Sequence, residues 1–185
     1  AALYSIPNPR ICRGNHAKAK SVTISLGPGE QSKLFMEVDF TIIHTANAFL
    51  MKSFLHARLS VDSIKEVLGI WRRKGNLDVS EFMYDQAIQQ ELVSTNRQNL
   101  RFHGKQAGNH EQISIMLSNW KKIVRLMEIR TFCTADTVIL KMLFDTEHIL
   151  EFLGANDAVM FRMQEIRNSV VKNMRLNYQP GYAYV

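Results

Sequence analysis

The sequence lacks the short motifs that usually mark a nucleotide-binding protein or a serine hydrolase. It contains no G-x-x-x-x-G-K-[S/T] or G-x-G-x-x-G loop and no G-x-S-x-G turn around a nucleophile. Gly27 and Gly29 flank Pro28, which a phosphate-binding turn disfavours because proline has no N–H group to offer. These absences predict a non-enzymatic protein with no catalytic residues and no cofactor.

Cysteine is also scarce, with Cys12 and Cys133 as the only two. Two cysteines do not make the disulfide framework of a small secreted domain. Asn-x-Ser/Thr glycosylation sites are absent as well, which agrees with reduced thiols inside a cell. A secreted helical signalling ligand would require Cys12 and Cys133 to be bonded, and it is the least favoured of three function hypotheses.

No stretch of the sequence reaches the roughly 18 uninterrupted apolar residues of a membrane-spanning helix. The run Val138–Leu140, for example, ends at Lys141. The first residues, Ala1–Tyr4, show neither the charged nor the apolar part of a signal peptide. We therefore expect no membrane partner, and a location in a virion or inside the cell, the nucleus included.

Metal-binding patterns are equally sparse. A metal site needs several His, Cys, Asp or Glu side chains at suitable spacing. The nearest approach is Asp145, His148 and Glu151, which a helix would bring close to one another on its surface. Carboxylate-bridged metal bundles need such a group on two helices, and this sequence has it on one. No metal site is predicted.

The middle of the sequence, residues 38 to 176, shows helical periodicity, with apolar residues at spacings of three and four. The pattern predicts an all-α fold, an irregular bundle of about six helices. The predicted helices span residues 34 or 38 to 57, 61–74, 79 or 81 to 95, 111–131, 135–153 and 157–176. Ser60, Thr134 and Asn156 are expected N-caps. Gly75 and Gly154 are expected just beyond a helix end.

The two ends of the sequence do not show this periodicity. Residues 1–34 include the Gly27–Gly29 break and are predicted as an extended basic arm. Alternating polar and apolar residues over 21–26 predict a short strand within it. Residues 177–185 are predicted as a short extended tail. The chain therefore divides into an arm, a helical body at 35–176 and a tail.

Positive charge exceeds negative charge, with a net charge of +6 and a pI near 9.4. Such a balance favours acidic partners such as nucleic acid. The basic residues gather in the arm, at the end of the second predicted helix and in a long polar loop at 97–110. We predict that the phosphate backbone is bound by Arg10, Arg13, Lys18, Lys20, Arg72, Arg73, Lys74, Arg97, Arg101 and Lys105.

Trp71 and Trp120 each stand beside basic residues, an arrangement that suits single-stranded nucleic acid. Both also fall on the apolar stripe of a predicted helix, so packing in the core is the preferred explanation. The nine methionines, many on the inner faces of the last three helices, are likewise interpreted as core residues rather than as a soft binding groove.

The charge balance reverses between residues 128 and 157. An acidic face on the fifth helix and a basic arm in one chain favour head-to-tail contact between copies. The residues predicted for self-association are Asp145, Glu147 and Glu151 on this face and Tyr178, Tyr182 and Tyr184 in the tail. In the alternative, both arms fold back on their own body and the charges neutralise one another within the molecule.

Three function hypotheses follow. The first is a structural protein that self-associates and coats or packages nucleic acid, RNA rather than DNA, as nucleoproteins and coat proteins do. The second is a helical dimerisation or partner-binding module of a larger intracellular or nuclear regulatory protein, which holds a protein partner in a groove between helices. The secreted ligand is the third.

Overall fold

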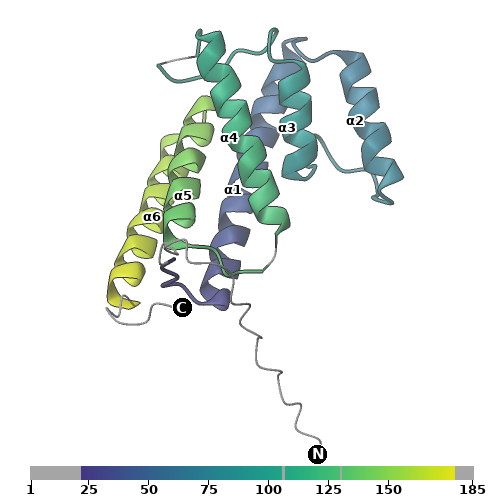
Figure 1. Ribbon diagram of the computed structural model, residues 1–185. Helices are drawn as coiled ribbons and strands as arrows, with labels where there is room; N and C mark the ends of the chain where they lie inside the picture. The colour runs from purple at the N-terminus through teal and green to yellow at the C-terminus, as the bar shows by residue number, and fades with distance from the viewer. Residues whose placement is uncertain (1–21, 106, 130, 178–185) are drawn as a thin grey trace, which may run out of the picture.

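The computed structural model describes residues 22–105, 107–129 and 131–177. Within these ranges the chain forms an all-α bundle and contains no strand (Figure 1). The helices are α1 (Pro28–Leu55), α2 (Val61–Arg73), α3 (Gln86–Thr95), α4 (His110–Glu128), α5 (Asp136–Phe152) and α6 (Asp157–Asn177). The predicted fold class is confirmed. The strand predicted at 21–26 is wrong for residues 22–26, and Ser21 lies outside the described residues.

The first helix begins earlier than the sequence pattern predicts. Pro28 occupies the first turn of α1, where proline is favourable because the N–H group that it lacks would have no partner in the helix. The backbone N–H of Gly27 donates to Oε2 of Glu30 at 2.9 Å, which ties the preceding residue to the first turn. Gly27–Gly29 therefore starts a helix instead of preventing one, and residues 28–34 belong to the body.

Several other helix ends follow the predicted signals, but the N-cap of α5 is Ala135 instead of Thr134, and α4 ends at Glu128, before the predicted end at 131. Ser60 precedes α2, and Gly75 and Gly154 follow α2 and α5 with φ angles of +79° and +78°. The start of α3 also differs from the sequence pattern, which predicts it after Asp78 or Ser80. The helix begins only at Gln86, because the side chain of Asp85 accepts from the backbone N–H of Ile88 at 2.8 Å and caps the helix there.

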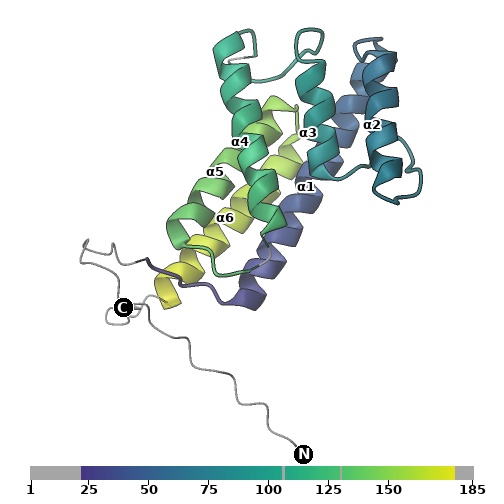
Figure 2. The same ribbon diagram turned by 45° about the vertical axis from the view of Figure 1, so that its right-hand side comes forward.

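The helices pack in two groups that share α1 and α4. Helix α5 contacts α1, α4 and α6, and helix α3 contacts α1, α2 and α4. Helix α2 lies at the edge of the bundle, as Figures 1 and 2 both show. We refer to the end of the bundle where α1 ends as the upper end. The opposite end, where α1 begins and α6 ends, is the lower end (Figure 1).

Trp120 lies at the centre of the bundle and is fully buried. Its indole Nε1 donates to Oε1 of Gln86 at 2.9 Å, and Nε2 of Gln86 donates to Oδ1 of Asp39 at 2.5 Å. This chain of hydrogen bonds satisfies buried polar atoms on α4 and α3 and links them to α1. Trp71 is half-buried and donates to the backbone oxygen of Leu77 at 2.7 Å. Packing therefore accounts for both tryptophans.

The segment before α1 folds back on the body. The backbone N–H and the hydroxyl of Ser25 donate to the two carboxylate oxygens of Asp136 at 2.8 and 2.6 Å. The backbone N–H of Asp136 donates in turn to the oxygen of Thr23 at 3.0 Å. Because these groups bond to the first turn of α5, residues 22–26 do not need a partner strand. For this part of the arm, the alternative in which it lies on its own body is the correct one.

Candidate nucleic-acid interface

A short segment at the upper end, residues 101–105, is held firmly against the body. The ring of Phe102 stacks on that of Phe152 with centroids 4.0 Å apart and planes at 9°. On its other side lies the ring of Phe49, stacked at 5.6 Å. All three rings are buried. Since Phe102 points inward, its neighbours Arg101 and His103 are exposed.

The backbone of this segment is fixed as well. The N–H of His103 donates to the oxygen of Phe152 at 3.0 Å, at the end of α5. The imidazole of His103 lies directly over Gly154, where a Cβ atom would come within 2.5 Å of the ring. Gly154 thus serves two purposes: its φ of +78° ends α5, and its missing side chain leaves room for His103.

Beside this segment lies a cleft of about 300 Å³, which we call the basic cleft. It is lined by Phe49, Lys52, Ser53, His56, Arg58, Arg101, Phe102 and His103, from the end of α1, the residues after it and the 101–105 segment. Among the described residues, no carboxylate lines this cleft. Lys52, Arg58 and Arg101 therefore set its charge, with His56 and His103 beside them.

The three cations of the basic cleft have no carboxylate partner in the part of the chain that the structure describes. Its salt bridges use Arg72, Lys74, Lys141, Arg162 and Arg167 instead. Three like charges that share a cleft without a counter-charge repel one another. An arrangement of this kind suits an anionic ligand, which would relieve that repulsion.

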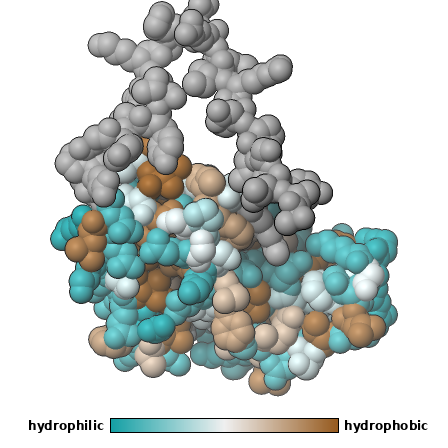
Figure 3. Space-filling view, turned by 90° about the horizontal axis from the view of Figure 1, so that it is seen from below, coloured by the Kyte–Doolittle hydropathy of each residue, from teal (hydrophilic) through white to brown (hydrophobic). Residues whose placement is uncertain are grey.

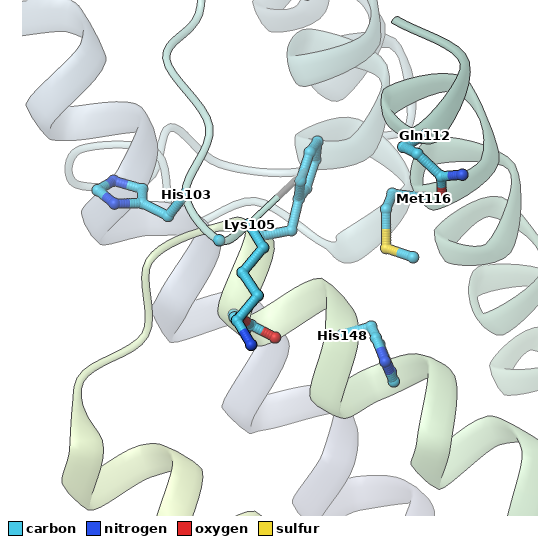
Figure 4. Close-up of a pocket in the computed structure, with 8 residues that line it drawn as sticks. His103, Lys105, Gln112, Met116 and His148 are labelled. Atoms are coloured by element: carbon cyan, nitrogen blue, oxygen red, sulfur yellow. The ribbon is translucent and has the colours of Figure 1, made fainter. Parts of the chain in front are cut away.

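On the other side of the 101–105 segment lies a pocket of about 370 Å³ between α4 and α5. Lys105 extends toward it from the loop, Gln112 and Met116 line it from α4, and His148 lines it from α5 (Figure 4). Glu151 is the one carboxylate among its lining residues, so it is less positive than the basic cleft. His103 borders both spaces, and Arg101 and Lys105 lie on opposite sides of it in the sequence.

The contiguous basic cluster Arg72–Lys74 is partly neutralised by neighbouring carboxylates. Nη2 of Arg72 lies 2.6 Å from Oδ2 of Asp78, and Nζ of Lys74 lies 3.5 Å from Oδ2 of Asp85. The hydrogen bond from Arg72 lowers the pKa of Asp78, so this carboxylate stays charged and keeps its partner neutralised. Arg73 is exposed and forms no salt bridge with a described residue.

The remaining predicted cations divide into two sets. Arg97 is exposed near the end of α3, and its Nη1 donates to the oxygen of Ser94 at 3.4 Å. The arm residues Arg10, Arg13, Lys18 and Lys20 lie outside the described residues. Of the ten predicted cations, Arg101 lines the basic cleft and Lys105 lies just beyond it. Sequence reasoning missed Lys52 and Arg58, which line the cleft from α1 and the residues after it.

The predicted exposed acidic face on α5 is wrong for two of its three residues. Asp145 is buried and bonds to Nζ of Lys141 at 2.7 Å, and Glu147 bonds to Nη1 of Arg167 on α6 at 2.7 Å. The physical reason is that α5 packs against α1, α4 and α6, and this packing covers Asp145 and most of the side chain of Glu147. Glu151 is exposed. Tyr178, Tyr182 and Tyr184 lie outside the described residues.

Two further findings bear on function. Across residues 22–105, 107–129 and 131–177, no three His, Cys, Asp or Glu side chains are grouped so that they could hold a metal ion. No helix in the same ranges has both the length and the apolar character needed to cross a membrane. Cys133 is exposed. Cys12 lies outside the described residues, so the expectation that the two thiols are reduced stays a prediction.

No family model, no curated protein and no solved structure matches the chain. Its function is therefore inferred from the geometry of the chain itself.

Proposed function

We propose that the protein is a non-enzymatic nucleic-acid-binding protein whose basic cleft holds the phosphate backbone, with single-stranded RNA as the expected ligand. The observation that carries this proposal is the set Lys52, Arg58 and Arg101, three cations that share a cleft without a carboxylate partner among the described residues. Cations that neutralise phosphates release counterions, and this release drives binding. Lys105, on the far side of His103, extends the positive surface along the 101–105 segment.

The shape and the rings of the cleft favour a single strand over a duplex. A space of about 300 Å³ suits a phosphate with its sugar, whereas a duplex would need a broad surface. His56 and His103 are exposed and offer flat rings beside the cations. Unpaired bases stack on such rings, while the bases of a duplex are already stacked on one another.

The proposal is tested by fluorescence anisotropy with a labelled single-stranded RNA of about 20 nucleotides, a length that covers a few typical single-strand sites. The test variant carries Lys52→Ala, Arg58→Ala and Arg101→Ala. Each phosphate contact contributes about −0.7 to the slope of log K against log salt concentration for a single strand. Loss of three contacts should therefore make the slope less negative by about 2 and weaken binding at low salt.

The matched control carries Lys33→Ala, Lys172→Ala and Arg175→Ala, three residues near the lower end that form no salt bridge with a described residue. Both variants lose the same net charge, so only the position of the charge differs. We expect the control to keep most of the wild-type salt slope. Equal losses in the two variants would overturn the proposal, because binding would then follow net charge and not the basic cleft.

The coating role also requires contact between copies of the chain. With Asp145 and Glu147 paired inside the bundle, we propose that the tail tyrosines Tyr178, Tyr182 and Tyr184 make this contact. Size-exclusion chromatography with light scattering, with and without RNA, measures it. A complex whose molar mass grows with RNA length, each increase equal to the mass of one protein chain, supports coating. A strict monomer on RNA long enough for several copies, at saturating protein, would contradict it.

A further inference from the structure

A second surface feature lies at the other end of α5, toward the lower end of the bundle. It is a groove of about 320 Å³ between the C-terminal half of α4 and the N-terminal half of α5. Its lining consists of Lys122, Ile123, Arg125, Leu126, Ile129, Val138, Lys141, Met142 and Asp145. We call it the α4–α5 groove. It does not share a residue with the basic cleft.

The surface of this groove is apolar and open to solvent. Ile123 and Met142 are buried and form its floor. Ile129 and Val138 form its walls and are 57% and 44% exposed. Single exposed apolar residues are common, but several around one depression often mark a contact site. Figure 3 looks at the lower end of the bundle, where apolar side chains lie open among polar ones.

Further apolar side chains are exposed on both helices beyond the groove. Ile115 lies two turns before Lys122 on the same face of α4 and is 42% exposed. Phe144 lies one turn after Lys141 on α5 and is 54% exposed. From Ile115 to Ile129 the helical rise amounts to about 21 Å, which is the length of about four helical turns.

The rim of the groove is positive. Lys122 and Arg125 form no salt bridge with a described residue. Among the described residues that line the groove, Asp145 is the one carboxylate, and Lys141 neutralises it at 2.7 Å. The side chain of Asp145 is only 9% exposed, so it presents little negative charge to the groove. A partner must therefore combine an apolar face with acidic flanks.

We propose that the α4–α5 groove binds an amphipathic acidic helix of about four turns from a partner protein, with its apolar face on Ile129 and Val138 and its carboxylates beside Lys122 and Arg125. A helix is the expected form because a groove between two helices offers apolar contacts but no free backbone edge. An extended segment gains its affinity chiefly from backbone hydrogen bonds to such an edge.

Charge argues against the occupants that this chain itself could supply. A second copy would bring the same cations, Lys122 and Arg125, against themselves in a symmetric contact, which costs free energy. Residues 1–21 contain four Lys or Arg and no Asp or Glu, and residues 178–185 contain no acidic side chain. Neither segment can place carboxylates on the rim, so a different protein is the better match.

The test uses a synthetic, fluorescently labelled peptide of about 16 residues, with Leu at i, i+3, i+4 and i+7 and Glu at the flanking positions. A second peptide replaces every Glu by Lys, and a third keeps the composition of the first but scrambles the Leu positions. Methyl NMR on the full chain reports whether Ile115, Ile129 and Val138 respond. We expect the Glu peptide to bind about tenfold or more tightly than either control and to shift these methyl signals.

Two pairs of protein variants separate the apolar from the electrostatic part. The double variant Ile129→Gln, Val138→Gln should bind the Glu peptide about tenfold more weakly. Its control, Met36→Gln with Phe161→Gln, changes exposed apolar residues elsewhere and should leave the affinity unchanged. The double variant Lys122→Gln, Arg125→Gln should weaken binding of the Glu peptide and reduce the salt dependence of that binding. The control Lys172→Gln with Arg175→Gln on α6 should change neither.

Four results would overturn the proposal. The first is equal binding of the Glu and Lys peptides, and the second is unchanged binding in the Ile129→Gln, Val138→Gln variant. The third is a concentration-dependent shift of the groove methyl signals without any peptide, which would assign the groove to a second copy. Shifts of the same methyl signals with RNA but not with the Glu peptide would assign it to nucleic acid and would also contradict the proposal.

Discussion

The two basic regions of this protein differ in how the chain treats their charges. Arg72–Lys74 is continuous in sequence, yet Asp78 and Asp85 pair with its first and last residues. The basic cleft takes Lys52, Arg58 and Arg101 from separate parts of the chain and leaves all three without a carboxylate partner among the described residues. The cations of the basic cleft are scattered in the sequence, but in the structure they are the ones that remain free to bind an anion.

This difference shows why a run of cations is weak evidence for a binding surface. A helix end attracts cations because they complement its dipole, and the loop that follows readily supplies carboxylates to pair with them. These two effects explain why cations occur at Arg72–Lys74. In the basic cleft, packing of Phe102 against the end of α1 holds the cations near one another, and no pairing with neighbouring carboxylates explains their presence.

The largest effect is expected from removal of the anchor of the basic cleft. Phe102→Ala empties a buried site between Phe49 and Phe152 and should lower the free energy of unfolding by about 3 to 5 kcal/mol. Phe54→Ala, at a phenylalanine of α1 that is 48% exposed, should cost about 1 kcal/mol or less. Urea unfolding measures both. Similar losses for the two variants would mean that the 101–105 segment is not anchored as described.

A smaller effect is expected at the glycine beneath His103. Gly75 and Gly154 share a positive φ, so alanine at either position should cost about 1 kcal/mol in backbone strain. At Gly154 the new Cβ also meets the ring of His103, which should add roughly 1 kcal/mol, whereas nothing lies within 4 Å at Gly75. Urea unfolding of both variants gives the difference.

The contribution of His103 to this difference can be isolated with a second background. In a His103→Ala protein, Gly154→Ala should cost no more than Gly75→Ala, because the ring that it would meet is gone. If the gap between the two glycine variants stayed as large without the ring, the contact between Gly154 and His103 would not be its cause.

The smallest effect concerns the pairing in Arg72–Lys74. The hydrogen bond from Arg72 lowers the pKa of Asp78, so the pair contributes stability above the ordinary Asp pKa and loses it as pH falls through the lowered value. Arg72→Ala should raise the pKa of Asp78 toward its ordinary value, as measured by NMR titration of the carboxyl carbon. Arg73→Ala is the matched control and should leave it unchanged. An unshifted Asp78 in both variants would mean that its partner is not Arg72.

Much of the fold could be predicted because its signals are local. Ser60, Gly75 and Gly154 act through their own backbone and side chains, so their neighbours suffice to interpret them. The predicted start of α1 is wrong because Pro28 is a breaker inside a helix but a favourable residue in its first turn, and position decides between the two. The start of α3 depends on whether Asp85 or Asp78 caps the helix, and the periodicity of apolar residues does not specify which of them does.

The site was less accessible to sequence reasoning because it depends on contacts between distant residues. Arg101 is predicted from its place in a polar loop, but Lys52 resembles an ordinary cation in the last turn of a helix. Only the stacking of Phe102 on Phe49 brings the two together. The predicted exposure of Glu147 fails for the same reason, since its partner Arg167 lies on α6. Lys141 stands four residues before Asp145 on α5, so that pair is local, but the burial of Asp145 depends on how α5 packs.

We expect the position of the cations, and not the amount of positive charge, to decide where nucleic acid binds. The most direct test compares two variants that lose three cations each: Lys52, Arg58 and Arg101 to Ala, and Arg72, Arg73 and Lys74 to Ala. The measurement is the slope of log K against log salt concentration for single-stranded RNA. We expect the cleft variant to lose about 2 units of slope and the Arg72–Lys74 variant less than about 1. Equal loss in both, or a larger loss in the Arg72–Lys74 variant, would contradict the account.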